Sequence, residues 1–322
     1  MTVQFTQGHA LVIGVGGDLP GTVDDAVGLA NLLRDSGRCA YPAAQVHLLS
    51  GSATSRAAIL ERLTHLAQTS DDEATVLVYF SGHGYEVTAS TGKSYYLMAH
   101  GYDVNRLFET AVSGVELADA LLAIPHRKLL LLLDCCHAGG LDNMKAPGLT
   151  LTKSPLPAEA QTRLAQGSGR VVIASSRADE LSFAGKPYSA FTLALLEVLS
   201  GEGVAQKDGY VRVADLALHT REKVPQRTGG RQHPILNFEQ ADNFTIAYYA
   251  GGDTESKGLP FDSEPVIEAE PGSLAQPGGQ RADARDRSTI VQGDGAVVAT
   301  GGSIAVGRDV GGNISLGRGG KK

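Results

Sequence analysis

Two short segments of the chain carry the residues that could do chemistry. His83 stands between two glycines just after the apolar run 76–80, and Cys136 comes shortly after five leucines at 129–133. Each run is too short for an isolated helix and is typical of a buried strand that ends in a tight loop. In open α/β sheets, ligands bind in the crevice beyond the carboxyl ends of the strands. We therefore expect the thiol and the imidazole to lie side by side at one sheet edge.

A thiol beside an imidazole is the arrangement that hydrolyses peptides through a covalent intermediate. The imidazole activates the sulfur and later protonates the leaving amine, while backbone donors stabilise the developing oxyanion. Cys135 could be the nucleophile instead of Cys136, because adjacent side chains at a strand end face opposite ways and only one can meet His83. A zinc site is the weaker interpretation, since Cys-Cys-His in direct succession lacks the usual ligand spacing. The plainest alternative is a buried structural thiol and an ordinary loop histidine.

The two segments resemble a known family. Ser-Gly-His-Gly at 81–84 and Asp-Cys-Cys-His-Ala-Gly at 134–139 are similar to the His and Cys blocks of the caspase-like peptidases, peptidase C14. They are most similar to bacterial metacaspases (orthocaspases), whose Cys block is Asp-Ser-Cys-His-Ser-Gly, and the His-to-Cys interval is close to that of caspases. The resemblance extends over about residues 8–247.

The resemblance implies a role for each motif residue. Cys136 would be the nucleophile and His83 the general base and acid, with Cys135 in the place of the family's serine. Backbone N–H groups near Gly84 and Cys136 would form the oxyanion hole. The implied activity is that of a cysteine endopeptidase.

Specificity follows from two acids. The block Gly-Thr-Val-Asp-Asp-Ala at 21–26 is similar to the metacaspase block Gly-Cys-Ile-Asn-Asp-Ala, which implies Asp25 and Asp134 as acids of the substrate pocket, with Ser81 lining it. Buried carboxylates repel each other and are costly to desolvate, so a substrate Arg or Lys is their natural partner. The alternative is that Asp25 is only a helix N-terminal acid. Arg177 is a cation that could reach the same cleft.

The elements around these loops predict an α/β fold. Strands are expected at 10–15, 45–49, 76–80, 95–98, 129–133, 170–176, 209–213, 233–237 and 243–247, and helices at 24–33, 56–68 with Thr54 as its cap, 113–122, 190–199 and 214–223. Strands that alternate with helices indicate a doubly wound, mostly parallel sheet with helices on both faces. The family resemblance implies that this is a caspase-like domain over 8–247, with a large-subunit-like region at 8–141 and a small-subunit-like region at 170–247.

The segment 142–169 separates those two regions. Its prolines and scattered cations among small polar residues predict a mobile linker that a protease could cut. Given a preference for Arg and Lys, the candidate self-processing positions are Lys145, Lys153, Arg163 and Arg170. Ordinary solvated loop cations are the alternative.

The C-terminal quarter differs in composition. Residues 248–287 form an acidic, proline-containing linker, and 288–322 repeat short β-branched runs punctuated by glycine. Three short repeats are marginal as a free-standing β-structure. The tail is therefore either disordered or a strand-forming module that pairs with a partner, such as an activating sensor protein.

Composition bounds the remaining possibilities. The 322 residues are 42% hydrophobic and 20% charged, with a net charge of −7, which argues against a nucleic-acid partner. Three cysteines and the absence of an N-terminal apolar segment or a long apolar run predict a cytoplasmic protein with no membrane association. Some metacaspases require calcium. The acids that could bind it here are dispersed along the chain, so no cofactor is expected; these acids are Asp103, Glu109, Glu116 and Asp119.

The function predicted from the sequence is a cysteine endopeptidase that cleaves after Arg or Lys. Family resemblance implies regulation by a partner or by processing in a bacterial defence or programmed-death pathway. Two other functions are left open. One is a catalytically silent caspase-fold scaffold that recruits a partner, and the other is a different thiol hydrolase, such as an amidase.

Overall fold

The computed structural model describes most of the first 261 residues. The described residues are 3–124, 128–135, 144–146, 149–154, 156–177, 179–180, 182–238, 241–261 and 266–267. Internal contacts divide the chain into two units, Met1–Pro271 and Gly272–Lys322. The glycine-rich tail predicted at 288–322 lies outside the described residues.

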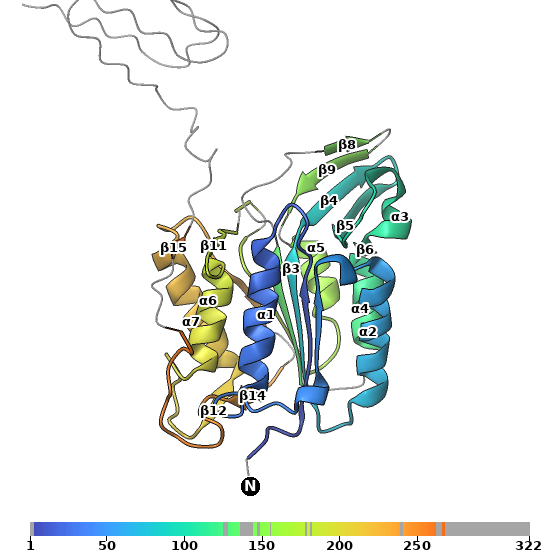
Figure 1. The fold of residues 1–322 in the computed structure, drawn as a ribbon. Coiled ribbons are helices and arrows are strands. Elements are labelled where there is room, and N and C mark those ends of the chain that lie inside the picture. The colour runs from blue at the N-terminus through green and yellow to red at the C-terminus, as the bar shows by residue number, and fades with distance from the viewer. Residues whose placement is uncertain are drawn as a thin grey trace, which may run out of the picture. The chain divides into compact units, whose positions relative to one another are not determined.

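Strands and helices alternate along the first unit, as Figure 1 shows. Their bounds are β1 Gly8–Gly14, α1 Gly21–Arg34, β2 Val46–Ser50, α2 Arg56–Thr69, β3 Thr75–Gly82, β4 Gly84–Ala89, β5 Gly92–Leu97, α3 Leu107–Thr110, β6 Val112–Ser113, α4 Gly114–Leu122, β7 Leu129–Cys135, β8 Met144–Ala146, β9 Leu149–Lys153, α5 Ala158–Leu164, β10 Arg170–Ala174, β11 Gly185–Lys186, α6 Ala190–Leu199, β12 Tyr210–Arg212, α7 Val213–Arg227, β13 Ile235–Asn237, β14 Thr245–Tyr248 and β15 Val266–Ile267.

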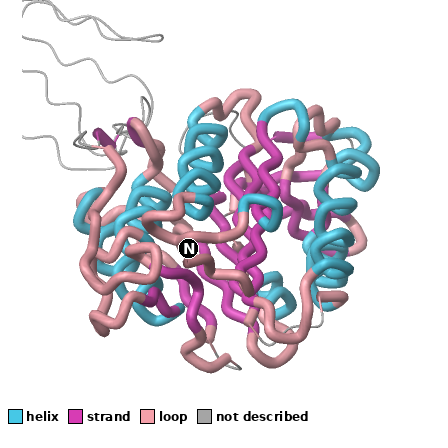
Figure 2. The backbone as a smooth tube through the Cα atoms, turned by 60° about the horizontal axis from the view of Figure 1, so that its bottom comes forward, coloured by secondary structure: helices cyan, strands magenta, loops and turns pink. Residues whose placement is uncertain are grey.

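The central sheet has six strands in the order β13-β10-β7-β3-β1-β2. All neighbours run parallel except β13, which is antiparallel to β10. Helices flank this sheet on both sides, as Figures 1 and 2 show. The predicted doubly wound, mostly parallel sheet is confirmed.

The leucine run of β7 explains why the sheet needs a helical layer on each face. Successive side chains of a strand point to opposite faces. Leu130 and Leu132 therefore join a core with α1, α6 and α7, whereas Leu131 and Leu133 join a second core with α2, α4 and α5. Burying one leucine contributes roughly 1.5–3 kcal/mol, so the run fixes β7 at the centre.

A second, antiparallel sheet in the order β6-β5-β4-β9-β8 was not foreseen. It encloses a small core that includes Tyr85, Tyr96 and Leu151. The segment 142–169, expected as a mobile linker, contains three regular elements: 144–146 is strand β8, 149–153 is strand β9, paired to β4, and 158–164 is helix α5. Leu156 and Leu164 anchor this stretch in the core under α4. Pro157 directly precedes α5.

Two helix starts show how local chemistry sets the boundaries. Ser55, not the expected Thr54, caps α2, because the Ser55 hydroxyl accepts from Ala58 N at 3.3 Å whereas the Thr54 hydroxyl donates to Gly51 O at 2.7 Å. Ser113 caps α4 in a capping box with Glu116. Among the described residues, no helix is both long and apolar enough to cross a membrane.

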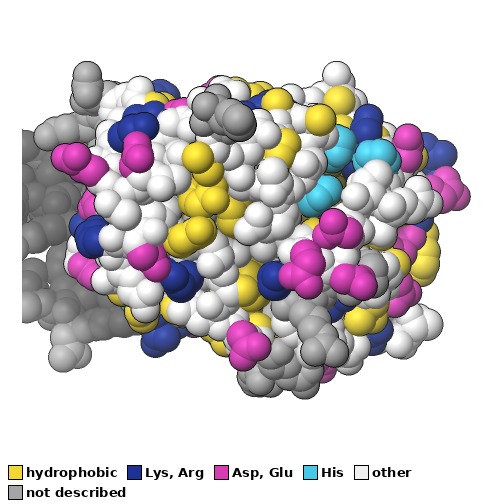
Figure 3. All heavy atoms as spheres, turned by 90° about the horizontal axis from the view of Figure 1, so that it is seen from below, with side chains coloured by type: hydrophobic (Ala, Val, Ile, Leu, Met, Phe, Trp, Pro, Cys, Tyr) yellow, Lys and Arg dark blue, Asp and Glu magenta, His cyan; other side chains and the backbone are white. Residues whose placement is uncertain are grey.

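The face at the bottom of Figure 1 carries mixed charge, since acidic and basic side chains are interspersed in Figure 3. Histidine side chains gather at one side of that view. His47 near the start of β2 and His65 near the end of α2 have ring centroids 5.1 Å apart. Burial and then the neighbouring charges of His65 and Arg62 lower the pKa of His47. This pair belongs to the amino ends of the strands, whereas His83 follows the carboxyl end of β3.

Candidate active site

His83 is held at the junction of the two sheets. It follows β3, of which every residue is buried, and its own side chain is 5% exposed. Its carbonyl oxygen accepts a hydrogen bond from Met98 N at 2.9 Å, and Gly84 begins β4 directly after it. A Cβ at Gly84 would lie 2.3 Å from Tyr95 Oη and 2.7 Å from Ser154 O, so only glycine fits there. The Ser-Gly-His-Gly motif therefore carries the chain from the central sheet directly into the second sheet and places His83 between them.

The imidazole of His83 meets a carboxylate that sequence reasoning missed. Asp18 Oδ2 lies 2.8 Å from His83 Nε2. Asp18 belongs to the loop between β1 and α1, where Gly16 and Gly17 have φ values of 70° and 71°. β1 is the neighbour of β3, with Gly14 opposite Ser81, so the two loops open at the same sheet edge. An acid in a glycine-rich loop after the first strand was the signal that could have found it.

The two predicted pocket acids lie close to each other. Ser81 and Asp134 are register partners on β3 and β7, and the Ser81 hydroxyl donates to Asp25 Oδ2 at 3.4 Å. Asp25 on α1 is 1% exposed and Asp134 is fully buried. Residues far apart in the sequence are thus assembled where three parallel strands end.

Hydroxyl groups from the second half of the domain hold these carboxylates. Asp134 accepts from Ser182 Oγ at 2.7 Å, Ser189 Oγ at 2.6 Å and Thr192 Oγ1 at 3.3 Å. Ser189 also donates its backbone N–H to Asp25 Oδ1 at 2.8 Å. One serine at the start of α6 therefore bridges both acids. No motif identified these hydroxyls, because serines that precede helices are common as simple caps.

A buried glutamine fastens the loop that supplies Ser182. Gln232 Nε2 donates to Ser175 O at 2.9 Å and to Ser182 Oγ at 3.2 Å. Gln232 Oε1 accepts from Phe183 N at 2.9 Å. These bonds position the Ser182 hydroxyl toward Asp134. Arg177 on the same loop is 57% exposed and pairs with Glu180 at 3.5 Å.

The two adjacent cysteines are treated differently by the structure. Cys135 ends β7 opposite Gly82 and is fully buried in the apolar core under α2, α4 and α5. Asp134 precedes it and faces the other side of the sheet, where α6 supplies its partners. Cys136, the predicted nucleophile and oxyanion-hole residue, lies outside the described residues, as do 137–143.

The candidate processing positions have distinct environments. Lys145 lies on β8 opposite Thr150, and Lys153 ends β9 opposite Tyr85. Arg163 is exposed on α5. Arg170 begins β10, is 5% exposed and donates from Nη2 to Ile124 O at 3.1 Å, and burial lowers its pKa.

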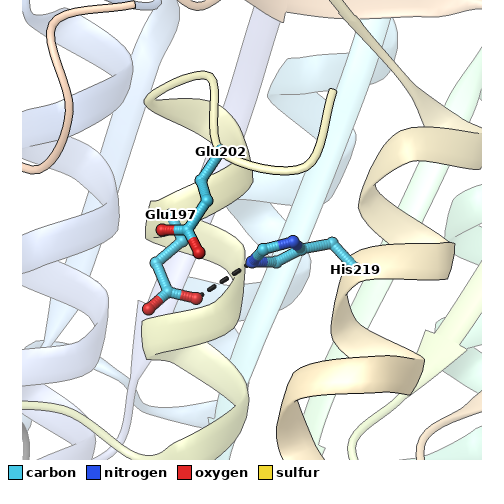
Figure 4. A group of neighbouring side chains, drawn as sticks. All are labelled: Glu197, Glu202 and His219. Atoms are coloured by element: carbon cyan, nitrogen blue, oxygen red, sulfur yellow. Dashed lines mark hydrogen bonds and ion pairs between the residues drawn. The ribbon is translucent and has the colours of Figure 1, made fainter. Parts of the chain in front are cut away.

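A group of possible metal ligands lies elsewhere, between α6 and α7. Glu197, Glu202 and His219 have ligand atoms within 4.8 Å of one another (Figure 4). His219 Nε2 lies 2.9 Å from Glu197 Oε2, Arg227 binds the other oxygen of Glu197, and Lys223 lies 3.2 Å from Glu202. Cations thus already neutralise both carboxylates, and the group is an ion-pair network that joins the two helices.

Three of the four acids weighed for calcium have local partners, namely Asp103, Glu109 and Glu116. Asp103 and Glu109 flank Arg106 at 3.1 and 3.5 Å. Glu116 binds Arg56 and completes the capping box of α4. These contacts occupy the carboxylates in helix starts and surface ion pairs.

The chain is similar to known proteins in two comparisons. The structure of protein GSU0716 from Geobacter sulfurreducens matches with a TM-score of 0.48 at 17% identity, covering 76% of this chain and 96% of that one. No curated protein matches the sequence. The family model of the peptidase C14 caspase domain matches residues 7–245, which is most of the chain. The chain therefore belongs to the caspase-domain family of cysteine peptidases.

Proposed function

We propose that this protein is an endopeptidase that cleaves after Arg or Lys, with Cys136 as nucleophile and His83 as general base and acid. Asp25 and Asp134 would bind the substrate cation, with Ser81 lining the same pocket, and N–H groups near Gly84 and Cys136 would bind the oxyanion. The family supports a cysteine peptidase in general, and the local geometry supports these finer assignments.

The reaction has two halves. His83 takes the proton of the Cys136 thiol, and the sulfur attacks the scissile carbonyl to give a tetrahedral oxyanion. That intermediate collapses as the protonated imidazole gives its proton to the leaving amine, leaving a thioester. Water then attacks the thioester with His83 as base, releasing the carboxylic acid and restoring the thiol.

The observation that best supports cleavage after Arg or Lys is that Ser189 bridges two buried carboxylates, those of Asp25 and Asp134. The Ser189 N–H donates to Asp25 at 2.8 Å and its hydroxyl donates to Asp134 at 2.6 Å. Like charges so close together in a buried site raise each other's free energy, and an Arg or Lys side chain placed beside them offsets this repulsion. A substrate with an acidic side chain would add to it.

The burial of Cys135 supports Cys136 as the nucleophile. Cys135 lies in the apolar core of the sheet face opposite to the partners of Asp134. A buried thiol in apolar surroundings resists forming the reactive thiolate. The next residue along an extended chain faces the other way. The burial of Cys135 and the alternation of side chains therefore favour Cys136 as the nucleophile.

The C-terminal linker is a route for regulation. Strand β15 of the linker pairs with β11, which lies in the loop between Ser182 and Ser189. Phe261 also contacts Tyr188, with ring centroids 5.3 Å apart, directly before Ser189. A partner or a cut that displaced this segment would act on the substrate pocket. The link to a bacterial defence or programmed-death pathway rests on family resemblance.

The test is hydrolysis of peptide amides that carry Arg, Lys, Asp or Leu before the scissile bond. The intact chain should prefer Arg or Lys, and activity should be lost in Cys136→Ala and His83→Gln but kept in Cys135→Ala. A charged hydrogen bond is worth about 1.5–3 kcal/mol, so Asp134→Asn should lower kcat/KM for Arg peptides by roughly 10- to 100-fold. Asp24→Asn, an exposed acid on the same helix as Asp25, is the charge-matched control.

The alternatives give different results. Cleavage after Asp would contradict the pocket while sparing the Cys136–His83 pair. Hydrolysis of small amides but not peptides would favour an amidase. No hydrolysis by the intact chain or by a version ending at residue 271, together with no reaction of Cys136 with a thiol-directed Arg-peptide probe, would favour a silent scaffold.

A further inference from the structure

We propose that Asp18 is the positioning residue of a Cys136–His83–Asp18 triad, in which its carboxylate orients the imidazole and stabilises it when it is protonated. This inference rests on the proposed function, because it assigns a third member to the same catalytic machinery. Asp18 acts through His83 and touches neither the substrate nor the sulfur.

The contact fixes which ring nitrogen does the chemistry. Asp18 Oδ2 lies 2.8 Å from His83 Nε2. A carboxylate only accepts, so Nε2 carries the proton in this hydrogen bond. The neutral imidazole then exchanges protons with the sulfur and the leaving amine through Nδ1. Without the carboxylate, the ring would be less restricted in both tautomer and orientation.

The loop that carries Asp18 is built to hold it in place. Val15 N donates to Ser81 O at 3.0 Å, which ties the start of the loop to β3 two residues before His83. Gly16 N donates to Thr22 Oγ1 at 2.8 Å, and the same hydroxyl donates to Leu19 O at 2.8 Å. Both ends of the loop are thus fixed, one to the strand of the imidazole and the other to α1.

Burial favours a charged partner for His83 over a water molecule. The imidazole is 5% exposed, whereas the Asp18 side chain is 45% exposed. A largely buried imidazolium has lost most of its hydration, so a neighbouring anion offsets that loss. Asp18 itself keeps much of its solvent contact.

Two aromatic groups of the described residues lie near this pair. The Tyr85 ring on β4 has its centroid 5.9 Å from that of His83. Tyr102 lies near Asp18, and burial together with the charge of Asp18 raises the pKa of Tyr102. The raised pKa keeps the Tyr102 phenol neutral at neutral pH. Among the charged groups of the described residues, we therefore assign Asp18 as the partner of the His83 imidazole.

Removing the Asp18 carboxylate should shift the pH profile of kcat/KM in a defined direction. An anion beside an imidazole favours the imidazolium and raises its pKa. Asp18→Asn keeps the size and an accepting oxygen but removes the charge, so the imidazolium is lost at lower pH. The acid limb of the kcat/KM profile, where His83 loses its proton and becomes the base, should move to lower pH, and kcat should fall by roughly 10- to 100-fold, part of the usual effect of general acid–base catalysis. KM should stay within about twofold, because Asp18 binds no substrate.

The experiment compares the intact chain with Asp18→Asn, Asp18→Glu and the control Asp24→Asn. The kinetic readouts are kcat, KM and the pH profile on the best Arg or Lys peptide. A second readout needs no turnover: the pKa of the His83 ring, measured by NMR titration with the signal assigned by His83→Gln. We expect Asp18→Asn to lower this pKa, Asp18→Glu to restore part of the rate, and Asp24→Asn to match the parent in every measurement.

The outcomes separate this inference from the proposed function. If the parent enzyme depends on Cys136 and His83 but Asp18→Asn behaves like Asp24→Asn, the triad is overturned and the function stands. If the parent is inactive or indifferent to Cys136→Ala, the function fails, and the NMR titration then decides whether Asp18 controls His83. An unchanged pKa of the His83 ring in Asp18→Asn would overturn the inference in either case.

Discussion

Ser189 donates its hydroxyl to Asp134 Oδ2 at 2.6 Å, and this bond joins the start of α6 to the end of the central strand β7. The same hydroxyl accepts from Thr192 N at 3.0 Å and thereby caps α6. One side chain thus does two things at once, because it begins a helix of the second half of the domain and orients a carboxylate of the first half.

Ser189→Ala should therefore impair both stability and substrate binding. Loss of an N-cap costs about 0.5–2 kcal/mol, and loss of a donor to a buried carboxylate costs roughly 1–3 kcal/mol more. Urea unfolding should show a loss of about 2–4 kcal/mol, and KM for Arg peptides should rise several-fold.

Ser55→Ala is the matched control for that substitution. Ser55 caps α2 through a single 3.3 Å bond at an exposed position. It should cost about 0.5–1 kcal/mol and leave KM unchanged. Equal effects of both substitutions on KM would show that Ser189 is merely a cap.

The sequence allowed the central sheet to be predicted because burial determines it. The continuous apolar runs of β3 and β7 can only be central strands, and both cores then follow from alternation and from the apolar stripes of the helices. The second sheet escaped prediction because β4 and β9 are short and amphipathic, so long-range pairing rather than local pattern stabilises them.

The residues of the candidate site fall into the same two groups, those marked by a local pattern and those defined by long-range contacts. His83, Asp25 and Asp134 stand in motifs, and parallel register brings their strand ends together. Ser182 and Gln232 carry no signature of their own, and Asp18 is marked only by its place in a glycine-rich loop after the first strand. The roles of all three depend on loops that only the folded chain brings into contact. The assignment of the nucleophile stays a prediction from motif and alternation.

The segment around Phe261 should stabilise the substrate pocket. Phe261 is partly buried against the core of α1 and α6 and contacts Tyr188. Phe261→Ala should cost about 1–3 kcal/mol of stability and raise KM for Arg peptides, because Tyr188 precedes Ser189. Phe108→Ala, at a side chain that is 79% exposed, should stay within about 0.5 kcal/mol of the parent. A chain ending at residue 271 keeps Phe261 and β15, so it should bind substrate like the intact chain unless the tail itself is regulatory.

Self-processing, where it occurs, should not use Arg170. A protease must draw an extended segment into its cleft, and Arg170 lies in a buried strand with its guanidinium bound to Ile124 O. Intact-mass analysis of processed protein should show no fragment beginning at Val171, and Arg170→Gln should leave the fragment pattern unchanged while lowering stability by about 1–3 kcal/mol. Arg163→Gln, at an exposed position, should remove one fragment without this loss if Arg163 is cut. A fragment that begins at Val171 in folded protein would contradict this reasoning.

The ion-pair network between α6 and α7 should make stability depend on pH in the acid range. Burial alone would raise the pKa of Glu197, but the hydrogen bonds and charges of His219 and Arg227 outweigh burial, so its pKa lies below the ordinary value. A carboxyl whose pKa is lowered by folding adds stability above its unfolded pKa of about 4.3, and this stability is lost as the pH falls through the folded value. Denaturant unfolding should therefore show Glu197→Gln less stable than the parent at pH 7, with the difference shrinking below about pH 4.

Glu202→Gln, which alters a half-exposed acid paired with Lys223, should show only a small and nearly constant difference. A difference for Glu197→Gln that does not change between neutral and acid pH would mean that packing, not charge, joins the two helices.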